Sequence, residues 1–274
     1  MRIAQRLGLA VGAGLVVAAL WAGAASTATA QNSQPDLSKV TKGEALPVKD
    51  VSFSFQGMFG VYNKAALQRG FQVYKEVCAT CHSLKQIAFR DLAALGYSEA
   101  EVKAIAKGWP TKAATFNPVT GDRGERDNIP SDRIPAVYYA GQGVPPDLSL
   151  MTKARHDGGA YVYSLLTGYA EQPAELLKQF PDAKTPDGLH YNPYFANLNL
   201  AMPAPLTTDG QVTYSDGTKA SVDQMAKDVS AFLVWTAEPK LDKRKQTGWA
   251  VLGFLLVATV LAYLAKKNVW ADKH

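Results

Sequence analysis

The sequence predicts a mainly α-helical domain with long irregular loops, followed by one C-terminal transmembrane helix. Two segments carry apolar residues at helical spacing, Pro- and Gly-rich stretches separate them, and residues 248–265 contain no charge. Strand patterns are few. The part of the chain between an N-terminal apolar segment and the C-terminal helix, residues 31–239, is long enough for one sizeable domain.

The chain begins with a segment typical of a secretory signal peptide. Arg2 and Arg6 form a basic start, residues 7–25 are uncharged, and Ala28-Thr29-Ala30 offers a small-residue cleavage site. We therefore expect residues 1–30 to be a signal peptide and residues 31–239 to be exported to the periplasm. The alternative is a retained N-terminal anchor, because the apolar run is long enough to span a bilayer.

The first predicted helix leads into the only two cysteines of the chain. Asn63 can cap a helix that starts at Lys64 and runs to about Val77. Residues spaced by four, three and four positions form one helical face, namely Leu67, Phe71, Tyr74 and Cys78. The helix therefore delivers the cysteine motif at its C-terminus.

The motif is Cys78-Ala-Thr-Cys81-His82, which allows three interpretations. A structural zinc site needs four Cys or His ligands, so at least one would come from a distant histidine. A redox dithiol fits the cysteine spacing but needs no histidine beside it. The spacing Cys-x-x-Cys-His is the attachment signature of a c-type haem. In that reading two thiols form thioethers with the haem edge, and the imidazole of His82 binds the iron. We favour the haem.

A haem ligated by His82 leaves a sixth iron position to fill. Met202 stands in the stretch NLNLAMPAPL, where Pro203 and Pro205 stiffen the chain and remove backbone donors. This suits a strap that holds a thioether at a fixed distance, so Met202 is the favoured ligand. The other candidates are Met58, Met151, Met225, His156 and His190. Of these, Met225 lies on an apolar helical stripe and is expected to be core.

Two further helices are predicted, at residues 159–168 and 221–237. The second begins with Ser221 and Gln224, which can form a capping box. Its stripe consists of Met225, Val229, Phe232 and Leu233. Residues 108–146 and 172–205 are expected as long irregular loops. Such loops are unusual in a compact domain, but a large apolar haem supplies a core that loops can wrap.

Residues 248–265 are long enough to cross a membrane. At 1.5 Å per residue they cover roughly 27 Å, and Trp249 and Trp270 flank them as interfacial aromatics do. The preceding residues 240–247 are expected as a basic linker, and residues 266–274 as a cytoplasmic tail. Basic residues flank the helix on both sides, so charge alone does not set its orientation. The signal peptide sets it, because it exports the residues that precede the helix.

The net positive charge of the chain comes from its two ends. The formal net charge is +5, but residues 31–239 contain 20 basic and 22 acidic residues. The high pI therefore reflects the membrane-flanking segments, and no basic surface for nucleic acid is expected.

Four stretches of the mature chain resemble the cytochrome c1 family, the haem subunit of the quinol–cytochrome c oxidoreductase (bc1) complex. They are FSFQGMFGVYNKAALQRGFQVYKEVCATCHSLK, PPDLSLMTKARHDGGAYVYSLLTGY, GLHYNPYFANLNLAMPAPL and DVSAFLVWTAEPKLDKRKQTG. The resemblance runs from about Val51 to Lys267. It implies a cytochrome c-like haem domain with enlarged loops and a single C-terminal anchor in a bacterial inner membrane.

The resemblance also implies roles for individual residues. Cys78 and Cys81 correspond to the thioether sites of one covalently bound haem c, and His82 and Met202 to its iron ligands. Arg155 and Tyr161 correspond to residues near the haem propionates, and an arginine can bind a carboxylate through two hydrogen bonds. One departure from the family pattern is Asp157, which stands where a glycine is usual.

The function that the resemblance implies is electron transfer rather than catalysis by this chain alone. The expected donor is the Rieske iron–sulfur protein, the expected acceptor is a c-type cytochrome, and cytochrome b is the obligatory partner in a dimeric complex. A membrane-anchored monohaem cytochrome c that serves a dehydrogenase or terminal oxidase is the first alternative. A membrane-tethered thiol oxidoreductase is the second.

Overall fold

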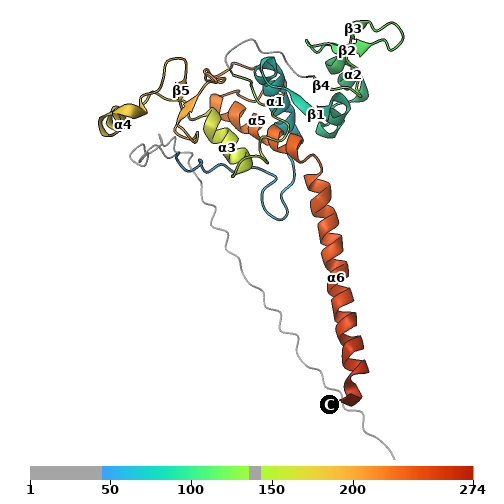
Figure 1. The fold of residues 1–274 in the computed structure, drawn as a ribbon. Helices are drawn as coiled ribbons and strands as arrows, with labels where there is room; N and C mark the ends of the chain where they lie inside the picture. The colour runs from blue at the N-terminus through green and yellow to red at the C-terminus, as the bar shows by residue number, and fades with distance from the viewer. Residues whose placement is uncertain (1–44, 136–142, 274) are drawn as a thin grey trace, which may run out of the picture. The chain divides into compact units, whose positions relative to one another are not determined.

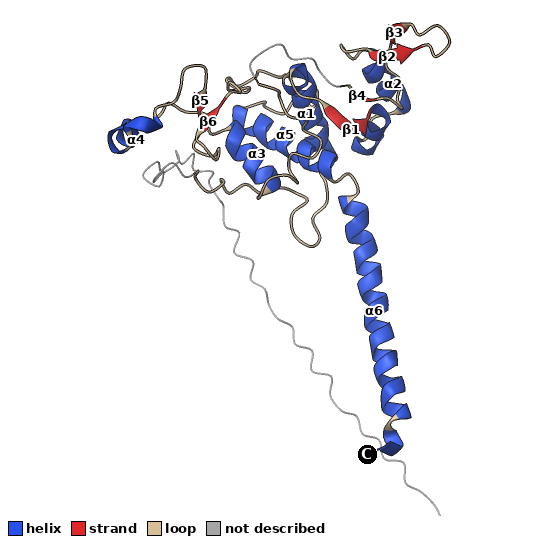
Figure 2. Cartoon of the chain, viewed as in Figure 1, coloured by secondary structure: helices blue, strands red, loops and turns tan. Residues whose placement is uncertain are grey.

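The structure is a computed structural model that describes residues 45–135 and 143–273 (Figure 1). The signal peptide and cleavage site expected at residues 1–30 lie outside the described residues. Figure 2 shows that helices dominate the described part and that its strands are short. The predicted fold class is confirmed.

Long irregular segments connect many of the helices and strands. The α-helices are α1 Lys64–Glu76, α2 Glu99–Lys107, α3 Gly158–Leu166, α4 Ala174–Gln179, α5 Val222–Ala237 and α6 Leu241–Val269. The short 3-10 helices are η2 Cys78–Thr80, η3 Phe89–Leu95, η4 Pro181–Ala183 and η5 Ala271–Lys273. The strands are β1 Leu84–Ala88, β2 Ala113–Phe116, β3 Arg123–Arg126, β4 Arg133–Ile134, β5 His190–Tyr191 and β6 Asn199–Leu200. They form three antiparallel pairs, β1 with β4, β2 with β3 and β5 with β6.

The helix starts predicted from capping residues are confirmed at α1 and α5. The side-chain oxygen of Asn63 accepts a hydrogen bond from the backbone N–H of Ala66 at 3.2 Å. The Ser221 hydroxyl accepts one from the N–H of Gln224 at 3.1 Å. The Gln224 side chain does not return to the cap, because its amide donates to Asp228 at 3.0 Å. The capping box is therefore only half formed.

The core forms where α1 crosses α5, and α3 packs against α5 beside it (Figure 1). Gly70 allows the close approach, since a Cβ at this position would lie 2.1 Å from the backbone oxygen of Asp228. Around the crossing, the rings of Phe71, Tyr74 and Phe232 pack with centroid distances of 5.6 and 5.7 Å. The crossing therefore holds together the helix that leads into the cysteine motif.

Arg69 and Asp228 form an ion pair beside the crossing. The carboxylate of Asp228 is almost fully buried and accepts from the Arg69 guanidinium at 2.8 and 3.1 Å. A second carboxylate, Asp216, binds the same guanidinium at 2.8 Å. Paired in this way, the buried charge of Asp228 is compensated.

The long loops predicted at residues 108–146 and 172–205 carry short elements that the sequence did not indicate. Strands β2, β3 and β4 lie in the first loop, and α4, η4, β5 and β6 lie in the second. Each of these elements has two to six residues. Helix α2 was not predicted either, although Ser98 and Glu101 form a complete capping box at its start.

Helix α6 is the single described helix that is long and apolar enough to cross a membrane. It begins at Leu241, whose side chain is buried in the main core, and its apolar side chains from Val251 onward are exposed. In the basic stretch expected as a linker, residues 240–247, Lys240 is the N-cap of this helix and the other seven residues form its first turns. The anchor is therefore packed against the domain at its first residue.

Candidate haem site

The turn after α1 gathers the three residues of the motif. Helix η2 follows α1 after one residue, and the carbonyl oxygen of Cys78 accepts from the N–H groups of Cys81 at 3.1 Å and His82 at 2.9 Å. Both cysteines are half-buried free thiols, and Cys78 packs against the main core. A single turn of backbone thus presents both sulfurs and the imidazole from one place.

The imidazole of His82 is held by one backbone carbonyl. Its Nδ1 lies 2.8 Å from the oxygen of Pro146. Because a carbonyl oxygen only accepts, Nδ1 must donate, which leaves the Nε2 lone pair available to a metal. Metal-bound histidines are commonly oriented by such a bond from the second ring nitrogen. In addition, the buried Tyr74 hydroxyl donates to the backbone oxygen of His82 at 2.9 Å.

Asp147, the next residue after Pro146, fastens this loop to the motif. Its carboxylate accepts from the Ser83 hydroxyl at 2.9 Å and from the Lys85 N–H at 2.7 Å. Burial alone would raise the pKa of Asp147, but the hydrogen bonds from Lys85, Ser149 and Ser83 hold that pKa below its usual value. The Leu148 N–H also donates to the Ser83 oxygen at 3.0 Å. No spacing pattern in the sequence indicated a role for Pro146 or Asp147.

The thiol of Cys78 does not resemble that of a redox dithiol. Burial, with a smaller contribution from Cys81, raises the pKa of Cys78 to about 12. Reactive Cys-x-x-Cys pairs instead work with a lowered thiol pKa, because the thiolate is the nucleophile. The described residues also contain no group of three or more His, Cys, Asp or Glu side chains suited to a metal ion. Neither the dithiol nor the zinc interpretation gains support.

The strap around Met202 is tied to α3 by one buried asparagine. Asn192 donates from its side chain to the Leu165 oxygen at 2.8 Å, and its backbone N–H donates to the Leu198 oxygen at 2.8 Å. Strands β5 and β6 pair on either side of this turn. Beyond β6, the Tyr169 hydroxyl donates to the backbone oxygen of Met202 at 3.0 Å. Met202 is thus half-buried on a strap with fixed ends.

The other predicted site residues lie on or near α3. Tyr161 is half-buried on that helix and packs against the main core. Arg155 is exposed, and its guanidinium donates to the carbonyl of Ala154 at 3.1 Å. Met225, the methionine expected in the core, is fully buried there.

The backbone at position 157 has a conformation that suits a glycine. Asp157 has φ of 61°, in the left-handed region that costs an L-residue roughly 1–2 kcal/mol. It precedes α3, yet its side chain makes no capping hydrogen bond. No hydrogen bond or ion pair of the Asp157 side chain within the described residues offsets the strain.

We therefore expect Asp157→Gly to stabilise the domain. Glycine relieves the backbone strain but also raises the conformational entropy of the unfolded chain, which costs less than the strain. The free energy of unfolding should therefore rise by about 0.5–1 kcal/mol, which corresponds to about 1–4 °C in Tm. Thermal unfolding followed by circular dichroism checks this. A lower Tm for the variant would contradict the strain argument.

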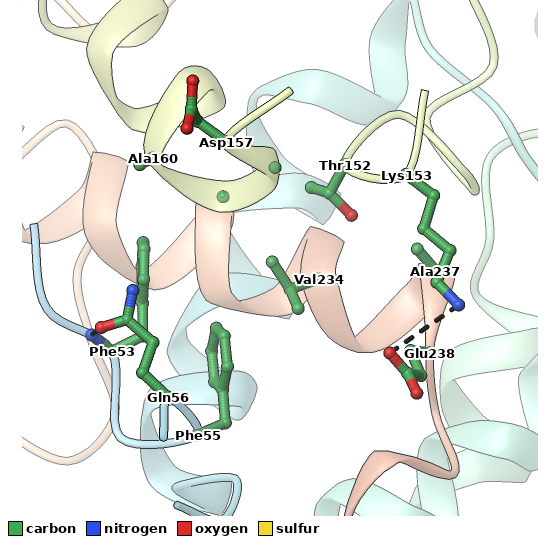
Figure 3. Close-up of a pocket in the computed structure, with 12 residues that line it drawn as sticks. Phe53, Phe55, Gln56, Thr152, Lys153, Asp157, Ala160, Val234, Ala237 and Glu238 are labelled. Atoms are coloured by element: carbon green, nitrogen blue, oxygen red, sulfur yellow. Dashed lines mark hydrogen bonds and ion pairs between the residues drawn. The ribbon is translucent and has the colours of Figure 1, made fainter. Parts of the chain in front are cut away.

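The described residues line at least two cavities outside the motif. The smaller, about 230 Å³, is shown in Figure 3, where Phe53 and Phe55 face Val234 of α5 and Lys153 pairs with Glu238 at 3.7 Å. None of the predicted site residues is among the described residues that line it. The larger, about 490 Å³, is lined by Tyr169, Glu171 and Ala204 among others, so it lies beside the Met202 strap.

The residues present fit a haem. Two unpaired thiols and an imidazole with a free Nε2 are grouped on one turn, and a thioether lies on a separate constrained strap. These are the donors that c-type attachment and His/Met ligation require. A mainly helical domain that combines these thiol, imidazole and thioether groups with an exposed apolar helix is typical of membrane-anchored haem proteins.

The comparisons with known proteins narrow this class. The Cytochrome C1 family model matches residues 53–273. Cytochrome c1 of Rhodospirillum rubrum is 42% identical over 240 residues, covering 81% of this chain and 87% of that protein. Cytochrome c1 2, heme protein, mitochondrial, of Arabidopsis thaliana is 42% identical over 229 residues, covering 79% and 70%. Cytochrome b/c1 of Bradyrhizobium diazoefficiens is 43% identical over 245 residues, covering 81% of this chain but 35% of that longer protein.

The chain belongs to the cytochrome c1 family. It is a haem-containing electron-transfer subunit of a bc1 complex, anchored to the membrane through the apolar C-terminal helix α6. The resemblance stated from the four sequence stretches is confirmed.

Proposed function

We propose that this chain takes one electron from the Rieske iron–sulfur protein and passes it to a c-type cytochrome. The carrier is one haem c, bound through thioethers to Cys78 and Cys81. The observation that supports this most strongly is the fixed imidazole of His82, whose Nδ1 is 2.8 Å from the Pro146 oxygen. When bound, the haem supplies a centre that gains and loses one electron at its iron.

The protein residues hold the iron ligands in place. His82 is the proximal ligand, and the Pro146 carbonyl fixes its tautomer and ring orientation. Met202 is the distal ligand, presented by a strap tied through Tyr169 and Asn192. His/Met ligation raises the haem potential, which suits a carrier that follows quinol oxidation. Arg155 and Tyr161 are the proposed partners of the haem propionates.

The topology follows from the export signal and the anchor. We place residues 31–239 in the periplasm, residues 248–265 across the bacterial inner membrane and residues 266–274 in the cytoplasm. The signal peptide is removed after Ala30. The complex contains cytochrome b and the Rieske protein and is a dimer.

Co-purification and quinol-driven reduction test the proposed function. A tag after His274 is used to isolate the complex in mild detergent, and its subunits are identified by mass spectrometry. We expect a di-haem cytochrome b and a Rieske protein, and quinol should reduce the haem of this chain only while the Rieske protein is present. Isolation with a dehydrogenase or terminal oxidase instead would favour the alternative of an anchored monohaem cytochrome.

An acidic segment leads into and out of the Met202 strap. Between Glu171 and Asp216 the chain has six acidic and two basic residues, a net charge of −4. Asp216 is paired with Arg69, and Asp209 lies 3.8 Å from Lys219. The other four carboxylates are exposed and take part in no ion pair within the described residues, namely Glu171, Glu175, Asp182 and Asp187. Glu171 lines the cavity beside the strap.

We expect these four carboxylates to steer a basic cytochrome toward the site. Changing them together to Gln or Asn should slow electron delivery about tenfold at low ionic strength, since steering acts mainly on the association rate. The deficit should shrink near 0.1 M salt, where the screening length is about 10 Å. Stopped-flow oxidation of the complex by a basic c-type cytochrome measures both effects.

A matched variant separates steering from total charge. It neutralises four exposed acidic residues outside the segment, Asp50, Glu99, Asp122 and Glu125. This control should keep most of the low-salt rate. If both quadruple variants slow the reaction equally, or if neither does, the segment is not the docking surface.

A further inference from the structure

The loop formed by residues 56–61 exposes apolar side chains beside the first turns of α6. Met58, Phe59 and Val61 are 64%, 80% and 53% exposed. The chain just before this loop is anchored, because Phe53 and Phe55 are buried and their rings stack at 5.2 Å (Figure 3). The loop therefore has a fixed base and an apolar tip that the described protein does not cover.

Lys245 binds the loop to α6 through three backbone carbonyls. Its ammonium group donates to the oxygens of Phe55 at 2.7 Å, Gly57 at 2.7 Å and Gly60 at 2.8 Å. These bonds use all three hydrogens of the ammonium group. The turn requires its glycines, since Gly57 has φ of 72° and a Cβ on Gly60 would lie 2.0 Å from the oxygen of Gln56.

A second contact strengthens this attachment. The carboxylate of Asp242 accepts from the Tyr62 N–H at 3.2 Å, and the Tyr62 hydroxyl donates to the Glu238 oxygen at 3.0 Å. The loop and the start of α6 are therefore joined on both sides of the apolar tip.

Stacking on Trp249 sets the level of the loop along α6. The rings of Phe59 and Trp249 lie 5.2 Å apart and are nearly parallel, at 7°. Trp249 is the second residue of the uncharged stretch 248–265, one helical turn or about 6 Å beyond Lys245. The headgroup region on each side of a bilayer is roughly 5–7 Å thick. With Lys245 among the headgroups, Phe59 reaches the hydrocarbon boundary.

We propose that the loop at residues 56–61 is a membrane-inserted contact, with Met58 and Phe59 embedded at the headgroup–acyl boundary of the bilayer. Its apolar surface is continuous with the exposed face of α6, and aromatic side chains favour this boundary. The three carbonyls that Lys245 satisfies would otherwise lack water there. The proposal rests on α6 as the membrane anchor and not on the route of the electron.

The contact constrains the element that carries the haem motif. Helix α1 begins at Lys64, three residues after the loop, and ends two residues before Cys78. A domain that is attached to the membrane by one helix alone is free to tilt. A loop inserted beside that helix removes this freedom, because both ends of the contact are fixed to the domain.

Photo-cross-linking in native membranes tests the proposal. Phe59→benzoylphenylalanine is made in the full chain, the membranes are irradiated, and the adducts are identified by mass spectrometry. Haem staining verifies that the variant still carries covalently bound haem. Trp249→benzoylphenylalanine serves as the positive control. Phe116→benzoylphenylalanine serves as the matched negative control, because Phe116 is 63% exposed on the β2–β3 pair.

We expect phospholipid adducts at positions 59 and 249 and far fewer at position 116. Cross-linking of position 59 mainly to a protein such as cytochrome b would overturn the proposal and assign the loop to a subunit interface. Lipid adducts at 249 without adducts at 59 would also overturn it. An absence of lipid adducts at both positions would refute the anchor itself, while leaving the electron-transfer role to be judged by quinol-driven reduction.

Discussion

Replacement of Met202 by leucine is expected to keep the covalent haem but to remove its distal ligand. Leucine has a similar volume and no atom that binds iron, so the strap should keep its Tyr169 and Asn192 bonds. The ferric Met–iron charge-transfer band should disappear. The haem potential should fall on the order of 0.2 V, within the span of about 0.8 V that axial ligands set. Electron delivery from the Rieske protein should fall with it.

Optical spectra and a redox titration of the purified complex measure these changes. Met225→Leu is the matched control, because Met225 is fully buried in the core and its replacement changes packing alone. That control should keep both the band and the potential. If the band persists in Met202→Leu, the distal ligand is another residue, and the strap has no ligating role.

The second large effect is expected at the crossing of α1 and α5. In Gly70→Ala the added Cβ would meet the Asp228 backbone oxygen at 2.1 Å and the Phe232 Cβ at 2.7 Å. Both neighbours belong to a packed helix, so the helices must separate to make room. Separation opens the Phe71–Phe232 contact and strains the Arg69–Asp228 pair. We expect a loss of about 3 kcal/mol or more, which lowers Tm by roughly 6–12 °C.

Thermal unfolding of the purified protein checks the size of this loss. Gly248→Ala is the control, since no atom lies within 4 Å of a Cβ built there and the residue is helical. The control should unfold at the original temperature or slightly above it. An unchanged Tm for Gly70→Ala would show that the helices do not cross as closely as described.

Local signals explain which parts of the fold the sequence predicted. Helix α1 was predicted from Asn63 and its apolar stripe, and α5 from Ser221 and Met225, because caps and helical periodicity act within a few residues. Strand β1 was missed because it pairs with β4 across about 50 residues, Leu84 opposite Ile134, and no hairpin turn joins the two strands directly. Two-residue strands such as β5 carry no alternation to detect.

The residues of the site also divide into those that local spacing predicted and those that only tertiary contacts bring together. Cys78, Cys81 and His82 were found because their spacing is itself the signal. Pro146, which fixes the His82 ring, lies 64 residues further on, and Tyr169 meets the Met202 backbone across 33 residues. No spacing rule links residues so far apart. Their contacts arise from tertiary packing. The four stretches that resemble the family include these residues, but the resemblance gave them no individual role.

The attachment of haem to Cys78 and Cys81 is the central claim, and peptide mass spectrometry tests it most directly. Cleavage after Lys75 and Lys85 releases the ten-residue peptide EVCATCHSLK from the denatured mature chain. We predict that this peptide carries the added mass of one haem and that neither thiol reacts with iodoacetamide. An unmodified peptide with both cysteines alkylated would contradict the proposed haem c and, with it, the electron-transfer role of this chain.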